Sequence, residues 1–152
     1  MIEEGEIKAK NKKASHEYFL MDKKVAGISL SGTEIKSIRD NKASIVEAYC
    51  TFMGDELYIR NMYIAEYAPG SYNNHEPRRE RKLLMKRNEL NKLKKKLKDV
   101  GLTCIPTKLF ISKNGLAKLE IAIAKGKKLY DKRHDLKEKD DKRQIQRNLK
   151  EY

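Results

Sequence analysis

Residues 102–125, LTCIPTKLFISKNGLAKLEIAIAK, predict a β-hairpin, and this hairpin decides the class of fold. The first arm, 102–111, is rich in strand-forming side chains, and Pro106 within it indicates a sheet edge or a bulge. The Lys-Asn-Gly segment at 113–115 has the composition of a turn. In the second arm one face carries Leu119, Ile121 and Ile123, and the other carries Lys118, Glu120 and Ala122. This alternation has the period of two that a strand requires.

Further short strands are expected on the N-terminal side of this hairpin. Residues 16–21 and 25–31 predict a second hairpin around a turn at 22–24. Residues 47–53 and 55–67 predict two more strands around a turn at Gly54 and Asp55. Short strands joined by tight turns favour a mainly β fold, a closed or nearly closed antiparallel barrel of about six strands on the plan of the OB-fold.

A short helix is expected to begin at Thr33, whose side chain can cap its first turn. Ile35 and Ile38 lie three residues apart on one side of this helix. On another side the spacing of three recurs in basic residues, which therefore share a rough face: Lys36, Arg39 and Lys42.

A long helix is expected over 78–100, between Pro77 at its start and Gly101 just past its end. Its apolar stripe consists of Leu83, Leu90, Leu93, Leu97 and Val100. Leu84 lies outside this stripe, among lysines and arginines. It is either an ordinary exposed leucine or an apolar contact inside a basic binding face, and the sequence leaves both interpretations open.

The positive charge of the chain is concentrated in two segments. The 152 residues include 35 Lys and Arg against 22 Asp and Glu, a net charge of +13, yet residues 1–77 carry −2 and residues 99–124 only +1. Residues 78–98 carry +9 and residues 125–152 carry +5. A solvated helix face and a soluble tail would also give such runs. Two separate runs on a near-neutral body favour a polyphosphate partner instead.

The length suggests one ordinary domain with additions at both ends. We expect a flexible, polar N-terminal arm over 1–14, an OB-like RNA-binding barrel over 15–126 and a basic C-terminal tail over 127–152. Within 131–152 only 4 of 22 residues are apolar, which cannot offset the entropy of ordering the chain. Asp135 with Lys139 has the favourable spacing of an ion pair on a helix. The tail is therefore predicted to be conditionally helical, loose in solution and ordered on a polyanionic surface.

Composition argues against several other classes of protein. No apolar run approaches the roughly 18 residues of a membrane span, and residues 1–6 are acidic and lack the apolar region of a secretory signal. Cys50 and Cys104 form no CxxC pair, and no Cys/His cluster has metal-ligand spacing. We therefore expect a cytoplasmic protein with two reduced thiols, no metal, no cofactor and no membrane partner.

The sequence offers poor candidates for catalysis. Adjacent residues on a strand point to opposite faces, so neither His16-Glu17 nor His75-Glu76 can act as a pair there, and no P-loop, nucleophile elbow or GxGxxG occurs. We expect no enzyme and no small-molecule substrate, with an RNA-processing enzyme as a minority alternative. A protein that recognises the shape and backbone of folded RNA is favoured. The runner-up is a generic ribosome-associated or RNA-chaperone OB-fold protein.

Three stretches, in chain order, resemble one known family. They are NKKASHEYF at 11–19, AGISLSGTEIKSIR at 26–39 with Lys42-Ala43 after it, and AKGKKLYDKR at 124–133. Between the second and third, residues 77–84 follow the pattern PxRxRKLL. From about residue 10 to 143 the chain resembles SmpB, the SsrA (tmRNA)-binding protein family of bacterial trans-translation.

The resemblance implies a barrel that grips the tRNA-like part of tmRNA and a tail that enters stalled ribosomes. The partners it implies are tmRNA and the RNA of the small ribosomal subunit. By position, the resemblance assigns Asn11, Leu84 and Lys118 to tmRNA. Further residues predicted to bind tmRNA are basic and lie in the matching stretches or on the short helix: Lys12, Lys13, Lys36, Arg39, Lys42 and Arg81. Those for the decoding region are Tyr130, Asp131, Lys132 and Arg133, and those for the mRNA channel are Lys137, Lys139, Lys142, Arg143 and Arg147.

Two further expectations follow from the resemblance. Tyr130 would stack on a ribosomal base, and the tail would fold only in an empty mRNA channel, because only then is there room for it. One position departs from the family pattern, since Val25 stands where the family often has Glu before the Ala-Gly pair. An RNA contact made by that Glu is therefore not expected here.

Overall fold

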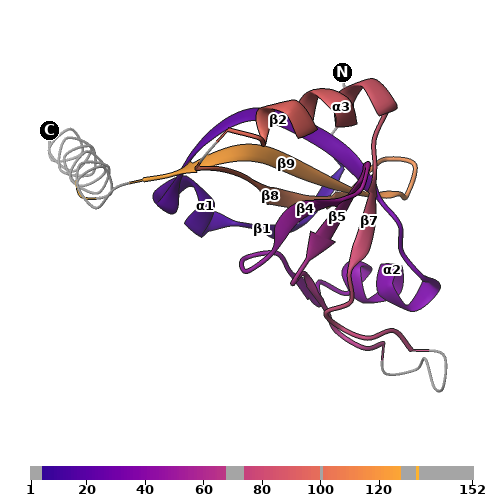
Figure 1. Ribbon diagram of the computed structural model, residues 1–152. Coiled ribbons are helices and arrows are strands. Elements are labelled where there is room, and N and C mark those ends of the chain that lie inside the picture. The colour runs from indigo at the N-terminus through magenta and orange to yellow at the C-terminus, as the bar shows by residue number, and fades with distance from the viewer. Residues whose placement is uncertain (1–4, 68–73, 100, 128–132, 134–152) are drawn as a thin grey trace, which may run out of the picture.

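A computed structural model describes residues 5–67, 74–99, 101–127 and 133 of the chain (Figure 1). Six strands of its large sheet form a closed antiparallel ring in the order β8, β4, β5, β7, β2, β9 and back to β8. In chain order the elements are β1 (Glu6–Lys10), α1 (Lys12–Glu17), β2 (Tyr18–Ile28), α2 (Gly32–Arg39), β3 (Ala43–Ser44), β4 (Tyr49–Met53), β5 (Glu56–Arg60), β6 (Tyr63–Ile64), β7 (Arg81–Leu84), α3 (Arg87–Lys96), β8 (Leu102–Ile111) and β9 (Ala117–Gly126). The mainly β, OB-like barrel expected from the sequence is confirmed.

The β8–β9 hairpin forms the longest wall of the barrel, as its sequence predicts. The pairing runs from Leu102 opposite Lys125 to Ile111 opposite Ala117, and its register shifts next to Pro106. A proline has no amide hydrogen for the ladder, which explains the bulge at that point. Gly115 turns the chain with a φ of +81°, a conformation that favours glycine.

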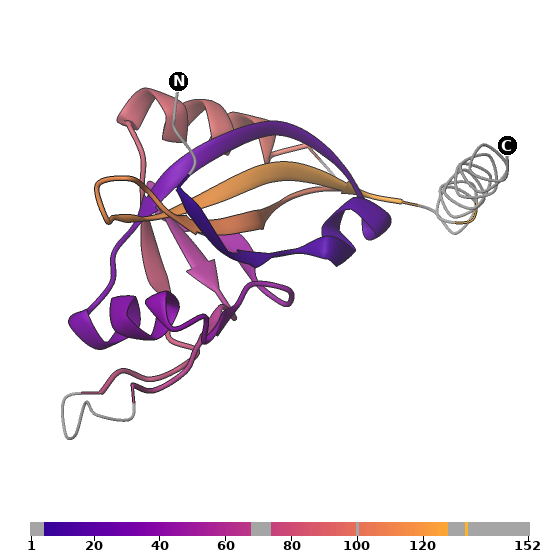
Figure 2. The same ribbon diagram turned by 180° about the vertical axis from the view of Figure 1, so that it is seen from behind.

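Both faces of β9 are buried, although alternation alone would leave one of them to solvent. Leu119, Ile121 and Ile123 point into the main core. On the other face Ala124 packs with Ala14 of α1, and the buried Glu120 carboxylate accepts a hydrogen bond from Thr107 at 2.8 Å. The helix α1 lies at the end of the barrel from which β9 leads to residue 127, away from α2 (Figure 2).

The expected hairpin over 16–31 is wrong, because β2 is one long strand. It pairs with β9 from Tyr18 to Gly27, and the register shifts between Met21 and Lys24. Asp22, with a φ of +50°, therefore marks a bulge rather than a reversal of the chain. Continuous pairing along β9 outweighs the local turn signal at 22–24.

The expected long helix over 78–100 is also wrong. In the described part of this range only Arg87–Lys96 is helical, and Arg81–Leu84 forms β7, which closes the ring between β5 and β2. Leu83 reaches the core from a strand as well as it would from a helix. The ring needs this strand, so tertiary pairing overrides the apolar spacing that favours a helix.

Two details in the N-terminal half differ from the pattern expected from the sequence. Residues 6–10, within the expected N-terminal arm, form β1, which pairs with β8. The strand expected over 55–67 is interrupted at Asn61, which has a φ of +64°. It therefore becomes β5 and the short β6, which pairs with β3 in a separate two-stranded sheet.

The two cysteines face each other inside the barrel. Cys50 of β4 lies opposite Cys104 of β8, and both are free and buried. A hydrogen bond between the Cys50 thiol and the sulfur of Cys104, together with burial, raises the pKa of Cys50 well above its usual value. Cys50 therefore stays protonated, and both buried side chains pack as part of the core. Among the helices within the described ranges, none combines the length and the apolar composition needed to cross a bilayer.

Candidate nucleic-acid interface

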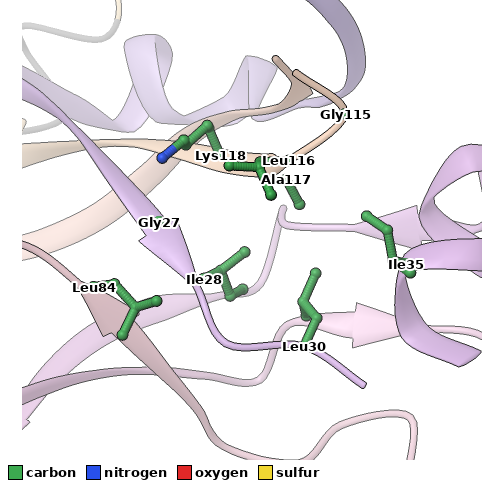
Figure 3. A pocket seen from close by; sticks show the side chains of 9 residues that line it. All are labelled: Gly27, Ile28, Leu30, Ile35, Leu84, Gly115, Leu116, Ala117 and Lys118. Carbon is green, nitrogen blue, oxygen red and sulfur yellow. The ribbon is translucent and has the colours of Figure 1, made fainter. Parts of the chain in front are cut away.

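A groove on the barrel wall brings together two residues predicted as RNA contacts, Leu84 and Lys118 (Figure 3). Leu84 ends β7 and Lys118 lies near the start of β9, and both are cross-strand neighbours of Gly27 on the intervening β2. The groove has a volume of about 240 Å³. The side chain of Leu84 is 52% exposed, so this leucine is available to a partner.

The missing side chain at Gly27 opens the floor of the groove. A Cβ placed there would lie 3.3 Å from the Cβ of Leu84, tighter than an ordinary contact. Ile28, Leu30 and Ile35 form the apolar wall on the side of α2. The 57% exposed Leu116, which no pattern in the sequence singled out, completes the rim next to Lys118. The site thus combines a shallow apolar surface with one ammonium group.

The basic face of α2 lies beside this groove. Lys36 follows the groove residue Ile35, and its Nζ stands 5.5 Å from the centroid of the Tyr67 ring. The Arg39 guanidinium approaches the 113–115 turn, where it lies 3.9 Å from the position of a Cβ on Gly115. Lys36, Arg39 and Lys42 are all at least partly exposed. Arg39 is thus next to the groove, and Lys36 lies on the helix that forms its wall, whereas Lys42 lies three residues beyond the end of α2.

The start of α2 is held by a buried carboxylate. Glu34 accepts a hydrogen bond from the backbone N–H of Ser31 at 2.9 Å, so Ser31, and not the expected Thr33, caps this helix. Thr33 instead exchanges a hydrogen bond of 2.9 Å with Nδ1 of His75, whose Nε2 donates to the carbonyl of Ile64. These contacts fix the orientation of α2 relative to β6.

Arg81 is not available to RNA, and its expected role is wrong. Its side chain is completely buried and forms an ion pair with Glu34, which also pairs with Arg79. The guanidinium donates further hydrogen bonds to the carbonyls of Met62 at 2.9 Å, Pro77 at 3.1 Å and Arg79 at 3.2 Å. Arg79 and Arg81 are two residues apart on one face of an extended chain, which is why one carboxylate can reach both.

The pKa values of this cluster show which effect dominates. Burial by itself raises the pKa of the Glu34 carboxyl, but hydrogen bonds from Arg79, from the Ser31 backbone and from Arg81 outweigh it, and the pKa lies below the usual 4.5. Burial lowers the pKa of Arg81, and the bond to Glu34 opposes that shift. The cluster is therefore ionic at neutral pH and serves to hold α2 against β7.

The predicted contacts Asn11 and Lys13 line a second hollow, and Lys12 between them is the first residue of α1. Asn11 precedes the helix and donates from Nδ2 to the carbonyl of Pro106 at 3.1 Å, while its buried Oδ1 finds no hydrogen-bond partner among the described residues. Lys12 and Lys13 are exposed, and Lys13 lies 3.9 Å from Glu47. The backbone N–H of Asn11 donates to the carbonyl of Thr107 in β8. Lys118 lies opposite Phe110, three residues further along the same strand. Two separate parts of the surface thus carry the predicted contacts.

Val25 lies opposite Glu120 in the β2–β9 ladder. A carboxylate therefore stands beside the position where the family often has Glu, but it is buried and engaged by Thr107. It does not replace an exposed acidic contact.

The tail leaves the barrel from a well-anchored point. The Lys127 backbone N–H donates to the carbonyl of Glu17 at 2.8 Å and its Nζ to the carbonyl of Ser15 at 2.9 Å, with Nζ also 5.1 Å from the Phe19 ring centroid. Of the residues predicted for the ribosome, Arg133 is described and exposed. The others lie outside the described residues: Tyr130, Asp131, Lys132, Lys137, Lys139, Lys142, Arg143 and Arg147.

These features define a small OB-like barrel with an apolar groove and basic surroundings, the class of a nucleic-acid-binding module. Within the described ranges no three His, Cys, Asp or Glu side chains gather as metal ligands. The model of the SmpB protein family matches residues 8–151, and the chain belongs to this family.

Curated relatives and a solved structure agree with this assignment. The chain is 58% identical to the SsrA-binding protein of Phocaeicola vulgatus over 144 residues, covering 95% of this chain and 96% of the relative. It is 54% identical to the SsrA-binding protein of Bacteroides thetaiotaomicron, covering 98% and 99%. A solved chain described as "tmRNA-SmpB: a journey to the center of the bacterial ribosome" is similar with a TM-score of 0.67 and 42% identity, covering 79% of this chain and 84% of that chain.

Proposed function

We propose that this protein binds the tRNA-like part of tmRNA and delivers it to ribosomes that have stalled without a codon. The observation that carries the proposal is the meeting of Leu84 and Lys118 across Gly27, because these residues come from distant parts of the sequence and form one exposed site. Membership of the SmpB family and the names of the relatives support the same RNA partner.

The chemistry of the groove suits a folded RNA. Leu84 and Leu116 offer an apolar surface to a ribose or an unstacked base, and Lys118 supplies a cation for an adjacent phosphate. Lys36 and Arg39 on α2, and Lys42 three residues beyond it, add further positive charge. Asn11, Lys12 and Lys13 form a second contact at α1, whereas Arg81 supports the fold and is left out of the interface.

The tail is assigned a different task in this proposal. Tyr130, Asp131, Lys132 and Arg133 bind in the decoding region, and the basic residues beyond them enter the empty mRNA channel. Coupled folding of such a segment costs about 2–5 kcal/mol, so only a vacant channel offers enough contacts to order it. Lys127 supports this division, since its bonds to α1 fix where the tail leaves the barrel.

The proposed partners are therefore tmRNA and the ribosome, with small-subunit RNA at the tail. Because the targets are stalled bacterial ribosomes, the place of action is the bacterial cytoplasm. The role is one of binding and delivery, with no catalytic step and no small-molecule substrate.

The first test addresses the groove. We expect Leu84→Ala and Lys118→Gln each to weaken binding of tmRNA by roughly tenfold, the loss of one good contact, while the thermal midpoint stays close to that of the native protein. Met53→Ala is a matched control, because Met53 is 46% exposed on β4 and outside the groove. Native affinity in both groove variants would contradict the assignment. Competition with an unrelated tRNA at matched salt separates tmRNA recognition from generic RNA binding.

The second test addresses the tail. A chain that ends after Gly126 should keep its affinity for tmRNA and lose release of stalled ribosomes in a reconstituted translation assay. Binding is measured by titration of labelled tmRNA, and rescue by the yield of tagged peptide. If the shortened chain lost both properties equally, the barrel and the tail would not have separate tasks.

A further inference from the structure

The cations of α3 and its C-terminal turn fall into two sets with different surroundings. Arg87, Lys94 and Lys96 pair with acidic residues of other elements, at 2.6 Å from Glu56, 3.0 Å from Asp55 and 2.5 Å from Asp22 respectively. Hydrogen bonds from these cations lower the pKa of all three carboxyl groups. This set is neutralised and fastens α3 to β2 and to the β4–β5 turn.

The second set, the outer lysine row, consists of Lys92, Lys95 and Lys98. All three are exposed, and among the described residues none of them lies within ion-pair distance of a carboxylate. Their spacing of three places them along the outer side of the helix and of the turn after it, where the Lys98 N–H donates to the Lys95 carbonyl at 3.3 Å. The nearby acidic residues Glu89 and Asp99 form no ion pair with the row. Within the described part of the chain, the row is thus an uncompensated strip of three positive charges.

The row lies nearer than the groove does to the end of β9 from which the tail leaves. Lys92 lines a hollow together with Ile123, and Lys98 lines another together with Leu102, which lies opposite Lys125. Lys125 precedes the anchor at Lys127 by two residues. By contrast, the groove of Leu84 and Lys118 lies at the other end of β2, near Gly27. The row and the groove therefore face different surroundings when the tail is engaged.

We propose that the outer lysine row of α3 binds the phosphate backbone of double-helical ribosomal RNA beside the site where the tail enters. The inference rests on the proposed function, because the direction of the tail decides which RNA the row meets. Three ammonium groups in a line match the regular negative charge of a duplex, without any need to read bases. The contact adds affinity for the ribosome that is independent of the groove.

The test compares two triple variants of the full-length chain. Lys92→Gln with Lys95→Gln and Lys98→Gln removes the row, and Arg87→Gln with Lys94→Gln and Lys96→Gln removes the paired set. Both lower the net charge by three and keep good helix formers. Binding to tmRNA and to purified ribosomes is measured for each over a range of salt concentrations, and thermal melts check that both variants are folded.

We expect the row variant to lose at least about tenfold in affinity for ribosomes near 0.1 M salt. The slope of log affinity against log salt should become shallower by about 2–3, because three lysines no longer neutralise phosphates and release counterions. Its affinity for tmRNA should stay within about twofold of the native value. The paired-set variant should keep the native ribosome slope, because its cations are already engaged within the protein.

Three results would overturn the proposal: a loss of tmRNA affinity in place of ribosome affinity, an equal loss in both triple variants, or no loss in the row variant. Failure of the proposed function is a separate result, since it appears in the native protein as a lack of preference for tmRNA over unrelated tRNA.

Discussion

Replacing Arg81 by methionine should make the barrel much easier to unfold without removing a contact to RNA. Methionine fills a similar volume but cannot donate hydrogen bonds. The substitution leaves the Glu34 carboxylate completely buried, with Arg79 as the arginine that still pairs with it. It also takes the donor away from the carbonyls of Met62 and Pro77.

The magnitude follows from the loss of one partner of a buried ion pair, which costs about 3–5 kcal/mol. Arg79 still compensates part of the charge, whereas the carbonyls without a donor add a penalty of about 1 kcal/mol or more, so these two corrections oppose each other. The expected loss is a large fraction of a typical stability of about 5–15 kcal/mol. For a chain of this size it corresponds to a fall in the melting midpoint of roughly 6–20 °C.

The assay combines urea unfolding with titration of tmRNA at a temperature at which the variant is folded. Lys82→Met, one residue along, is the control, because the Lys82 side chain is 43% exposed and pairs with Glu56 on the surface at 3.6 Å. Such a pair contributes about 0–1 kcal/mol. An Arg81→Met protein with native stability and weakened RNA binding would refute the reasoning and restore Arg81 to the interface.

Two further predictions concern the groove floor and acid stability. Gly27→Val places branched carbon atoms against the Leu84 side chain, which lies 3.3 Å from a Cβ at this position, so we expect tmRNA affinity to fall at least about tenfold in a titration. A native affinity would show that RNA does not enter the groove. Because the pKa of Glu34 lies below its usual 4.5 in the folded protein, its contribution to stability is present above that pH and is lost as the pH falls through the folded value. Glu34→Gln should therefore flatten the acid side of the curve of unfolding free energy against pH, and an unchanged slope would exclude Glu34 as its source.

Some features of the site follow from local pattern and others from pairing between distant strands. The spacing of apolar residues correctly identified the β8–β9 hairpin, and Lys36 and Arg39 are exposed on α2, whereas Lys42 lies beyond the end of that helix. Leu84 was also marked as an unusual leucine among basic residues. Apolar spacing, however, wrongly predicted a helix at the position of β7. The spacing within one segment carries no information about the strand that the ring needs between β5 and β2.

Arg81 and Lys118 show most clearly which features the local sequence does not determine. Arg81 lies between Glu80 and Lys82, whereas Lys118 lies between Ala117 and Leu119, so local composition alone would place Arg81 at the surface. One is completely buried with Glu34, 47 positions away, whereas the other lines a surface groove beside Gly27. Composition and periodicity are local quantities, so they determined the class of fold, the uneven charge and the motifs of the family. Whether a cation contacts solvent or a carboxylate depends on which segments meet, and long-range strand pairing decides that.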